Sequence, residues 1–507
     1  MSTIGQKMAK GAIWMVLAKL AERSLGFIST LVLARVLVPQ DFGIVAMAMS
    51  FVALLELINA FGFDTTLIQK QSRDRDQWDT AWTFNILLGA AVAVLMVLCA
   101  RPIANFYREP ALTAVILGLA LGSLTQGFQN IGVVAFRSEM EFNKEFAFLV
   151  GKKLIGLAIT IPLAILLESY WALVIGQVAG RTGSTVLSFL MHPYRPRFTL
   201  KASSELLNFS KWLLIGNCLG YLRERSSDWV IGRASGPVAL GTFNIAYELA
   251  SLPSSELAAP INRAVFPGYA KLAAEGGLRY GYLSVMGAIA LLVTPAVLGL
   301  ACTAPLVVPL VLGPKWLDAI PILVVLSFFG LTMLVQTNAH AAYLALGRAK
   351  LAAQLNMVHV SVQLAAMIPL TRLYGAIGAA SAYLVITVVM IPISMGVTLR
   401  LLKLSVLDFL AVIWRPLAAA AVMYAVVQWF IGLEPASSET LVLALQLARA
   451  VLLGAVIYVG LVMGLWVLCG KPAGAERMAL ERGLPFIQRF LQRVLKRRPT
   501  LPASVEK

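Results

Sequence analysis

The chain has 507 residues, of which 59% are hydrophobic and only 13% are charged. A soluble domain usually carries about 25% charged residues, so the composition excludes a soluble globular fold and makes lipid the solvent for most of the chain. The formal charge is +17. In a membrane protein such an excess of cations indicates orientation, because cations gather in cytoplasmic loops, and we do not expect nucleic-acid binding.

Nearly uncharged stretches recur along the whole chain, each close to the roughly 20 residues that cross about 30 Å of hydrocarbon. Runs this long exclude the alternating strands of an outer-membrane barrel, and backbone groups in lipid must bond to one another. The sequence therefore predicts an all-α, polytopic membrane protein of about fourteen transmembrane helices. The predicted spans are 11–34, 42–66, 80–100, 112–135, 148–168, 171–191, 209–231, 241–263, 282–312, 321–345, 351–371, 376–399, 412–432 and 443–469.

Lysine and arginine residues lie mainly in the termini and in every second loop. About 30 of the 42 are found there, against about six in the other loops, and cytoplasmic loops are the ones enriched in cations. We therefore expect a multi-pass protein of the bacterial inner membrane with both termini in the cytoplasm. The first apolar stretch contains Lys19, Glu22 and Arg23 and has no evident signal-peptide cleavage site, so we expect it to be retained.

The basic tail, residues 471–507, has an apolar face formed by Phe486, Ile487, Phe490 and Leu491. Two interpretations stay open for this cytoplasmic segment. It is either an interfacial helix on anionic lipid or an ordinary solvated tail.

An internal repeat appears when the sequence is shifted by 198 residues. Without a gap, Trp14 then aligns with Trp212, Arg35 with Arg233, Pro39 with Pro237 and Gly43 with Gly241. Six predicted helices separate the copies, so both copies have the same orientation in the membrane. The repeat predicts two pseudo-symmetric six-helix lobes, an N-lobe at 1–206 and a C-lobe at 207–410, with two added helices at 411–470.

Two segments resemble a known family. They are GAIWMVLAKLAERSLGFISTLVLARVLVPQDFGIVAMAMSF and SSDWVIGRASGPVALGTFNIAYELASLP. Both are similar to the polysaccharide-transporter branch of the MOP superfamily, which contains Wzx-type flippases and exopolysaccharide exporters. The resemblance covers most of the chain, and its motifs are the LARVLVPQDFG turn and its repeat IGRASGPVALGTFN.

The resemblance implies a flippase that moves an undecaprenyl-pyrophosphate-linked oligosaccharide from the cytoplasmic to the periplasmic leaflet by alternating access. Its transport would serve the biosynthesis of lipopolysaccharide, capsule or exopolysaccharide. The lipid-linked oligosaccharide, membrane lipids and polysaccharide polymerase machinery would be its partners. A MOP-type multidrug exporter and a lipid II flippase remain as alternatives. A scaffold or binding protein built on the same fold is a further one.

Charged residues near the middle of two predicted helices are the candidate site. Insertion scales put the cost of such a charge at about 2.5 to 3.5 kcal/mol, so these side chains are expected to face a cavity or a partner. Arginine and lysine are suitable ligands for a pyrophosphate, and we predict a cationic cleft from Lys19, Arg23, Arg223 and Arg225. Internal ion pairs are the competing interpretation. Candidates for ion pairing or for a coupling ion are Glu22, Glu56, Arg181, Glu224, Asp228 and Glu248.

Enzymatic function has little support in the sequence. Asp74-Arg75-Asp76 matches a D-x-D metal site only in outline, since it lies in a short charged loop. No phosphate-binding loop, H-E-x-x-H or G-x-S-x-G occurs. The four cysteines lie far apart without C-x-x-C spacing, and no metal or other cofactor is expected.

Overall fold

Every regular element in the part of the chain that the structure describes is a helix. The computed structural model describes residues 2–57, 67, 74–433, 439–472, 474–478 and 481. Within these residues eight helices are long and apolar enough to cross a membrane, or nine if one bent pair is counted as a span. The predicted all-α, multi-pass membrane fold is therefore confirmed, whereas the number fourteen stays a prediction.

The described chain packs as two compact units. The first consists of Met1–Ala246, Val308–Ile322 and Gln363–Ala382, and the second of Tyr247–Val307, Leu323–Val362 and Tyr383–Lys507. These units are defined by packing, whereas the predicted lobes are defined by sequence repetition. The assignment of lobes stays a prediction.

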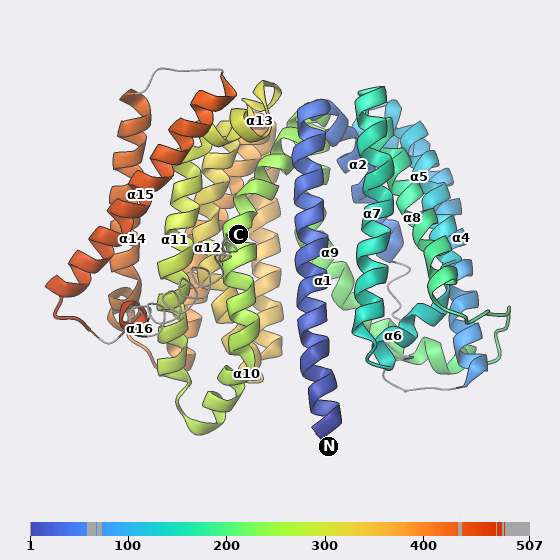
Figure 1. Cartoon of the computed structure of the whole chain (residues 1–507), viewed down its shortest axis with the longest axis horizontal. Coiled ribbons are helices and arrows are strands. Elements are labelled where there is room, and N and C mark those ends of the chain that lie inside the picture. The colour runs from blue at the N-terminus through green and yellow to red at the C-terminus, as the bar shows by residue number, and fades with distance from the viewer. Residues whose placement is uncertain are drawn as a thin grey trace, which may run out of the picture. The chain divides into compact units, whose positions relative to one another are not determined.

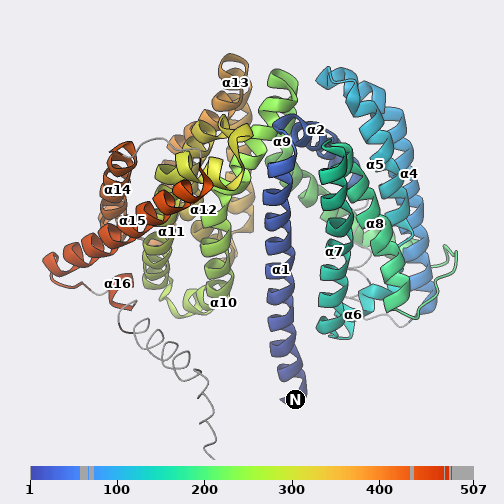
Figure 2. The same cartoon turned by 45° about the horizontal axis from the view of Figure 1, so that its top comes forward.

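The first unit is a helical bundle (Figure 1). Helix α7 packs against both α1 and α8, and α5 packs against both α4 and α8, as Figure 2 also shows. The long helix α9 belongs to this unit as far as Ala246. The bounds are α1 Ser2–Val36, α2 Pro39–Glu56, α4 Arg75–Tyr107, α5 Ala111–Gly127, η2 Ile131–Val134, α6 Ala135–Ser138, α7 Phe142–Leu167, α8 Trp171–Met191 and α9 Ser203–Pro253.

Glycines allow these helices to approach one another closely. A Cβ atom added at Gly156 of α7 would lie 3.6 Å from the Cα of Gly180 in α8. One added at Gly122 of α5 would lie 3.4 Å from the Cα of Val178. Small residues of this kind let membrane helices pack backbone against backbone, so the G-x-x-x-G spacings in α5 and α8 are explained by packing.

Two long helices contain a break at a glycine. Gly236 in α9 has φ +81°, and Gly375 in α13 (Ala349–Leu402) has φ +61°, a region that residues with a Cβ rarely adopt. The predicted spans 209–231 and 241–263 lie on either side of Gly236. Gly236 follows Val38, the N-cap of α2, by 198 residues, so both copies of the repeat change direction at the same point.

The two copies of the repeat meet at their matching glycines. A Cβ at Gly43 would overlap the carbonyl group of Pro237, and a Cβ at Gly241 would overlap that of Pro39. The matching arginines behave alike, since each contacts the end of another helix. Arg35 donates to the carbonyl oxygens of Leu310 and Val311 at the end of α11, and the guanidinium group of Arg233 lies 5.9 Å from the ring centre of Phe106 at the end of α4.

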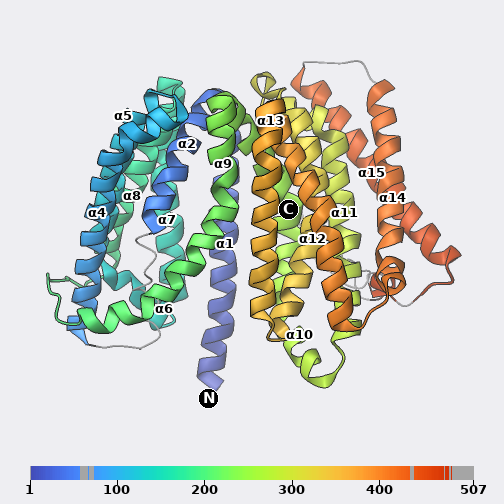
Figure 3. The same cartoon turned by 180° about the vertical axis from the view of Figure 1, so that it is seen from behind.

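The second unit begins at Tyr247, within the second arm of α9. A π-helical turn, η3 Ser254–Ala258, leads into α10 Ala259–Glu275, and a core formed by Tyr282, Met286 and Val293 of α11 lies fully buried. Figure 3 shows α11, α12 and α13 side by side, with α14 and α15 packed on each other at the edge of the unit. The remaining bounds are α11 Leu278–Val311, η4 Pro314–Trp316, α12 Ala319–Ala345, α14 Val406–Leu433, α15 Thr440–Leu468 and α16 Ala475–Met478.

Candidate functional site

An ion pair inside the first unit joins two of the predicted candidates. The guanidinium group of Arg181 in α8 contacts Glu56 at the end of α2, with Nη1 on Oε1 and with Nη2 3.3 Å from Oε2. Ser123 of α5 completes the group, because its hydroxyl donates to Glu56 over 2.9 Å and accepts from Arg181 over 2.8 Å. The side chains of Arg181 and Glu56 are 14% and 25% exposed. This bidentate arrangement is the strong form of an arginine–carboxylate hydrogen bond.

The local sequence explains why Arg181 reaches this position. Gly122 leaves room beside its side chain, since a Cβ there would lie 3.1 Å from Cδ of Arg181. Hydroxyl groups continue the polar contact between α5 and α8, with Thr185 donating to the carbonyl oxygen of Thr125 over 2.8 Å. The face shared by α5 and α8 is therefore polar.

A second ion pair lies on the first arm of α9. Arg225 Nη1 is 3.1 Å from Asp228 Oδ2, and Asn244 also hydrogen-bonds to Asp228. Asp228 is buried, whereas the side chain of Arg225 is 44% exposed. The structure thus places the Arg225 guanidinium group at the surface of the first unit while its carboxylate partner is inside.

Tyrosine hydroxyls from α4 and α9 meet the backbone and side chain of α2 in the same unit. The hydroxyl groups of Ser50 and Tyr107 lie 3.0 Å apart, and Tyr221 donates to the carbonyl oxygen of Ser50. The ring of Phe51 stacks on Trp229 with 5.6 Å between ring centres. Sequence reasoning missed this cluster, because its residues come from three separate helices.

Glu22 and Gly26 of α1 lie beside two lysines of α7. Glu22 lies 4.0 Å from Nζ of Lys152, and a Cβ at Gly26 would lie 3.6 Å from Nζ of Lys153. Lys19 and Arg23 are both exposed. The α1–α7 contact therefore contains one carboxylate and two lysines, and the two lysines of α7 were not predicted as part of a site.

The remaining candidates stay apart from these groups. The side chains of Arg223 and Glu224 lie outside the described residues. Glu248 lies on the second arm of α9, in the second unit, and is half-buried. The structure therefore brings together Glu56 with Arg181, Arg225 with Asp228, and Glu22 with Lys152. What each pair does stays a prediction.

The D-x-D sequence has a structural explanation. Asp74 is the N-cap of α4 and accepts a hydrogen bond from the backbone N–H of Asp76 over 3.1 Å. The Asp76 carboxylate lies 3.5 Å from Nζ of Lys201. Capping by aspartate satisfies the free N–H groups at a helix start.

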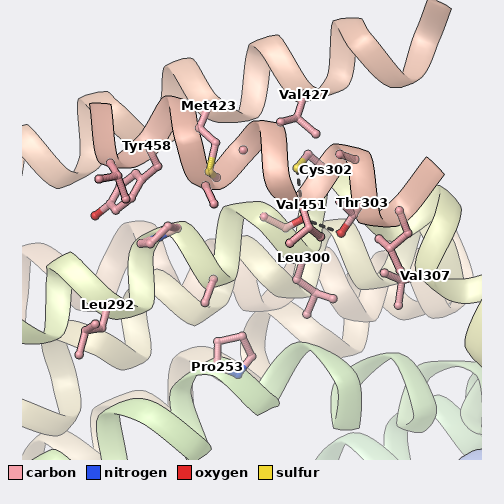
Figure 4. Close-up of a pocket in the computed structure, with 18 of the residues that line it drawn as sticks. Pro253, Leu292, Leu300, Cys302, Thr303, Val307, Met423, Val427, Val451 and Tyr458 are labelled. Atoms are coloured by element: carbon pink, nitrogen blue, oxygen red, sulfur yellow. Dashed lines mark hydrogen bonds between the residues drawn. The ribbon is translucent and has the colours of Figure 1, made fainter. Parts of the chain in front are cut away.

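An apolar cavity of about 570 Å³ lies in the second unit between α11, α14 and α15 (Figure 4). Pro253, Leu292, Met423 and Val451 are among its lining residues. Its few polar groups already have partners inside the protein. The hydroxyl of Thr303 donates to the carbonyl oxygen of Gly299 over 2.7 Å, and that of Tyr458 donates to Leu291 over 2.8 Å. Such a lining suits a hydrocarbon chain.

Known proteins share both sequence and fold with this chain. The Escherichia coli (strain K12) "Lipopolysaccharide biosynthesis protein WzxC" is 27% identical over 82% of this chain and 85% of its own length. The Bacillus subtilis (strain 168) "Teichuronic acid biosynthesis protein TuaB" is 23% identical over 83% and 89%. The solved structure "Lipid II flippase MurJ, inward closed conformation" has the same fold, with a TM-score of 0.72 and 14% identity over 90% of this chain and 99% of that one.

A family model described as "Polysaccharide biosynthesis protein" matches residues 32–321. The match includes both copies of the repeat motif and spans more than half of the 507 residues. The resemblance found in the sequence is thus confirmed, and the chain belongs to the polysaccharide biosynthesis protein family.

Proposed function

We propose that this protein is a flippase or exporter that moves an undecaprenyl-pyrophosphate-linked oligosaccharide from the cytoplasmic to the periplasmic leaflet. The observation that carries the proposal is the family match over residues 32–321 in a multi-pass helical membrane protein. The two relatives are named for different surface polymers, lipopolysaccharide and teichuronic acid. The proposal therefore names the class of substrate, a lipid-linked oligosaccharide. It does not specify whether the finished polymer is lipopolysaccharide, capsule or exopolysaccharide.

The chemistry of such a substrate fits two features of the structure. Its pyrophosphate requires cationic donors, and Arg225 together with the exposed Lys19 and Arg23 supplies them. Its polyprenyl chain requires an apolar surface, and the cavity between α11, α14 and α15 has one. In this proposal Lys19, Arg23, Arg223 and Arg225 bind the headgroup.

We place the protein in the bacterial inner membrane with both termini in the cytoplasm, because of the distribution of lysine and arginine along the chain. An anion that leaves a negative-inside cytoplasm gains about 2.3 kcal/mol per charge per 100 mV. Outward movement of a pyrophosphate is then favoured by the membrane potential. The proposal includes no catalytic step and no cofactor, and polysaccharide polymerase machinery is the partner expected downstream.

Alternating access is the mechanism we propose, and the contact between Gly43 and Gly241 supports it. Two matching turns meet there backbone against backbone, and the proposed topology puts this contact on the periplasmic side. Opening the protein to the periplasm requires that these turns separate, and Gly43 and Gly241 contact the backbone of Pro237 and Pro39 there without side chains of their own.

The proposal is tested in a host that lacks its own oligosaccharide flippase. We expect the wild-type chain to restore surface polysaccharide, and an Arg225→Ala variant to restore much less at equal membrane abundance. Arg348→Ala, which removes an exposed cation between α12 and α13, serves as the control and should behave as wild type.

Two further strains separate the alternatives. A host depleted of its lipid II flippase tests the second candidate, which the fold shared with a lipid II flippase favours. A host lacking drug exporters tests extrusion of cationic dyes. Rescue of either strain without any restoration of surface polysaccharide would reject the proposal.

A further inference from the structure

The segment between α8 and α9 is held firmly to the rest of the first unit. We call residues 192–202 the strap. The Asp79 carboxylate, which is buried, accepts from the Tyr194 hydroxyl over 2.7 Å and from the backbone N–H of Arg197 over 3.0 Å. The Asn130 side chain donates to the carbonyl oxygen of Tyr194 over 2.8 Å. Buried polar groups are thereby satisfied by the strap itself.

Two buried threonines of α4 hold the other end of the strap. The hydroxyl oxygen of Thr83 accepts from the backbone N–H of Thr199 over 3.1 Å, and that of Thr80 accepts from Ala202 over 3.3 Å. The strap therefore has contacts along its whole length that fix its backbone. Its outward side chains are held in place by this arrangement.

The outward face of the strap combines cations with apolar side chains. Arg195 and Arg197 are exposed, as is the Lys201 side chain at 75%. Between them Phe198 is 70% exposed and Leu200 is 50% exposed.

Carboxylates compensate only part of this positive charge. Arg75 of α4 adds a further cation beside the strap, with its Nη2 3.2 Å from the carbonyl oxygen of Arg195 and its side chain 54% exposed. Three carboxylates lie nearby. Asp74 caps α4, Asp76 lies 3.5 Å from Nζ of Lys201, and the buried Asp79 lies 3.6 Å from Nε of Arg75, whereas neither Arg195 nor Arg197 forms an ion pair among the described residues. The face therefore has an excess of positive charge.

The strap lies where the apolar surface of the bundle ends. Just before it, α8 exposes Val186 and Leu190, and beyond the first turns of α4 Leu87 is exposed as well. Figures 1 and 3 show the strap reaching outward past α4, at the side of the bundle away from α1. A side chain at the end of a spanning helix lies at the depth of lipid headgroups.

We propose that the strap is a docking surface for anionic phospholipid headgroups of the leaflet that surrounds it. Arg197 and Lys201 would bind headgroup phosphates, while Phe198 and Leu200 enter the boundary between headgroups and acyl chains. Mixed basic and apolar side chains at this depth are the chemistry by which interfacial segments bind anionic membranes. The strap lies between the two copies of the repeat in the sequence. Lipid bound to the strap would therefore hold this connecting segment at one leaflet of the membrane.

The experiment measures lipid binding by the full-length chain in nanodiscs that contain phosphatidylglycerol and phosphatidylcholine. After transfer to detergent, native mass spectrometry gives the ratio of the two lipids retained. We expect the wild-type chain to prefer phosphatidylglycerol, and Arg197→Gln/Lys201→Gln to lose at least about threefold of that preference, since two phosphate-binding cations are removed. The Phe198→Ser/Leu200→Ser variant should retain less of both lipids than the wild-type chain.

A matched control removes the same charge elsewhere. Arg348→Gln/Lys350→Gln changes two exposed cations at the start of α13 and should keep the wild-type preference. Arg197→Lys with Lys201 unchanged keeps the charge and should also bind as wild type, which separates lost binding from lost folding. An unchanged preference in Arg197→Gln/Lys201→Gln, or an equal loss in the control, overturns the proposal.

A further arm distinguishes phospholipid from the substrate headgroup. Undecaprenyl pyrophosphate is added to the same nanodiscs as a second probe. If Arg197→Gln/Lys201→Gln loses this probe but keeps phosphatidylglycerol, the strap contacts substrate and the proposal is wrong. The lipid ratio needs no transport, so its outcome is independent of whether the proposed flippase function holds.

Discussion

Three carboxylates of the first unit each lie beside a cation. Glu56 with Arg181 and Asp228 with Arg225 are within hydrogen-bond distance, and Glu22 lies 4.0 Å from Lys152. An ion pair reduces the free-energy cost of burying each charge. When one partner is removed, the other stays buried without a counter-charge, and the protein is destabilised. The pairs therefore have unequal consequences for stability, according to how deeply each is buried.

Removing both partners of the Arg181–Glu56 ion pair should destabilise the protein less than the two single removals added together. We expect Arg181→Ala to cost about 3 kcal/mol of unfolding free energy, because Glu56 is left in the bundle without its cation. The double variant Arg181→Ala/Glu56→Ala should cost at least about 1 kcal/mol less than the two single losses added together. Unfolding in detergent micelles measures all three. Additive losses would show that the pair does not couple, and Arg372→Ala at an exposed position is the control.

The strap should loosen in mild acid through His192. The pKa of His192 is lowered, mainly by burial of the ring. The nearby cations Lys144 and Arg195 lower this pKa further, whereas the carboxylates of Glu139 and Glu141 raise it. Nδ1 of His192 also accepts the backbone N–H of Tyr194 over 3.1 Å, which requires a neutral ring. Because the folded pKa lies below the ordinary value of about 6.5, the stabilisation is complete above that pH and is lost as the pH falls through the folded pKa.

Hydrogen exchange of residues 192–202 checks this dependence. Exchange should be faster at about pH 5.5 than at about pH 7.5, after correction for the intrinsic rate. His192→Gln, which does not titrate, should show the same protection at both values. Equal protection of the wild-type strap at the two pH values would contradict the assignment.

At the scale of elements, glycines decide how closely the helices approach. Those at Gly156 and Gly180 bring α7 to α8, whereas Gly43 and Gly241 bring one copy of the repeat to the other. The latter contact has backbone atoms on both sides. A side chain there cannot be accommodated by a change of rotamer, so the helices themselves must move apart.

Gly43→Val should therefore disturb the contact between the two repeat copies. Overpacking of this kind costs about 1 to 3 kcal/mol, and we expect a lower melting temperature together with loss of oligosaccharide transport. Gly460→Val is the matched control, because no atom lies within 4 Å of the Cβ position at exposed Gly460 of α15. Wild-type transport by Gly43→Val at equal abundance would show that the contact is dispensable.

The sequence could predict helices, their small-residue contacts and the family, since each depends on residues close together in the chain. The Arg225 and Asp228 pair follows from a spacing of three on one helix. Glu56 and Arg181 are 125 residues apart, and Glu22 lies similarly far from Lys152. Both pairs depend on which helices are neighbours, a question of packing that periodicity cannot answer. The strap was unrecognised for the same reason, because its anchors Asp79 and Asn130 come from other segments.

For the whole molecule, the distribution of charge makes a prediction about orientation. Both termini should be cytoplasmic, because lysine and arginine are concentrated in the termini and in every second loop. Green fluorescent protein fused after Lys507 should fluoresce, and alkaline phosphatase fused at the same point should be inactive. Active phosphatase at Lys507 would place the C-terminus in the periplasm and require an odd number of spans if the N-terminus is cytoplasmic.

The central claim is that a cationic site carries a lipid-linked oligosaccharide across the bilayer. Its most direct test measures the fraction of that precursor in the outer leaflet of cells that lack their own flippase, with wild type compared with Arg23→Ala, Arg223→Ala and Arg225→Ala at matched membrane abundance. We expect wild type to move the precursor outward and the three variants to leave it in the inner leaflet. Equal movement by wild type and all three variants would contradict the cationic site, and retention in the inner leaflet by wild type itself would contradict the transport function.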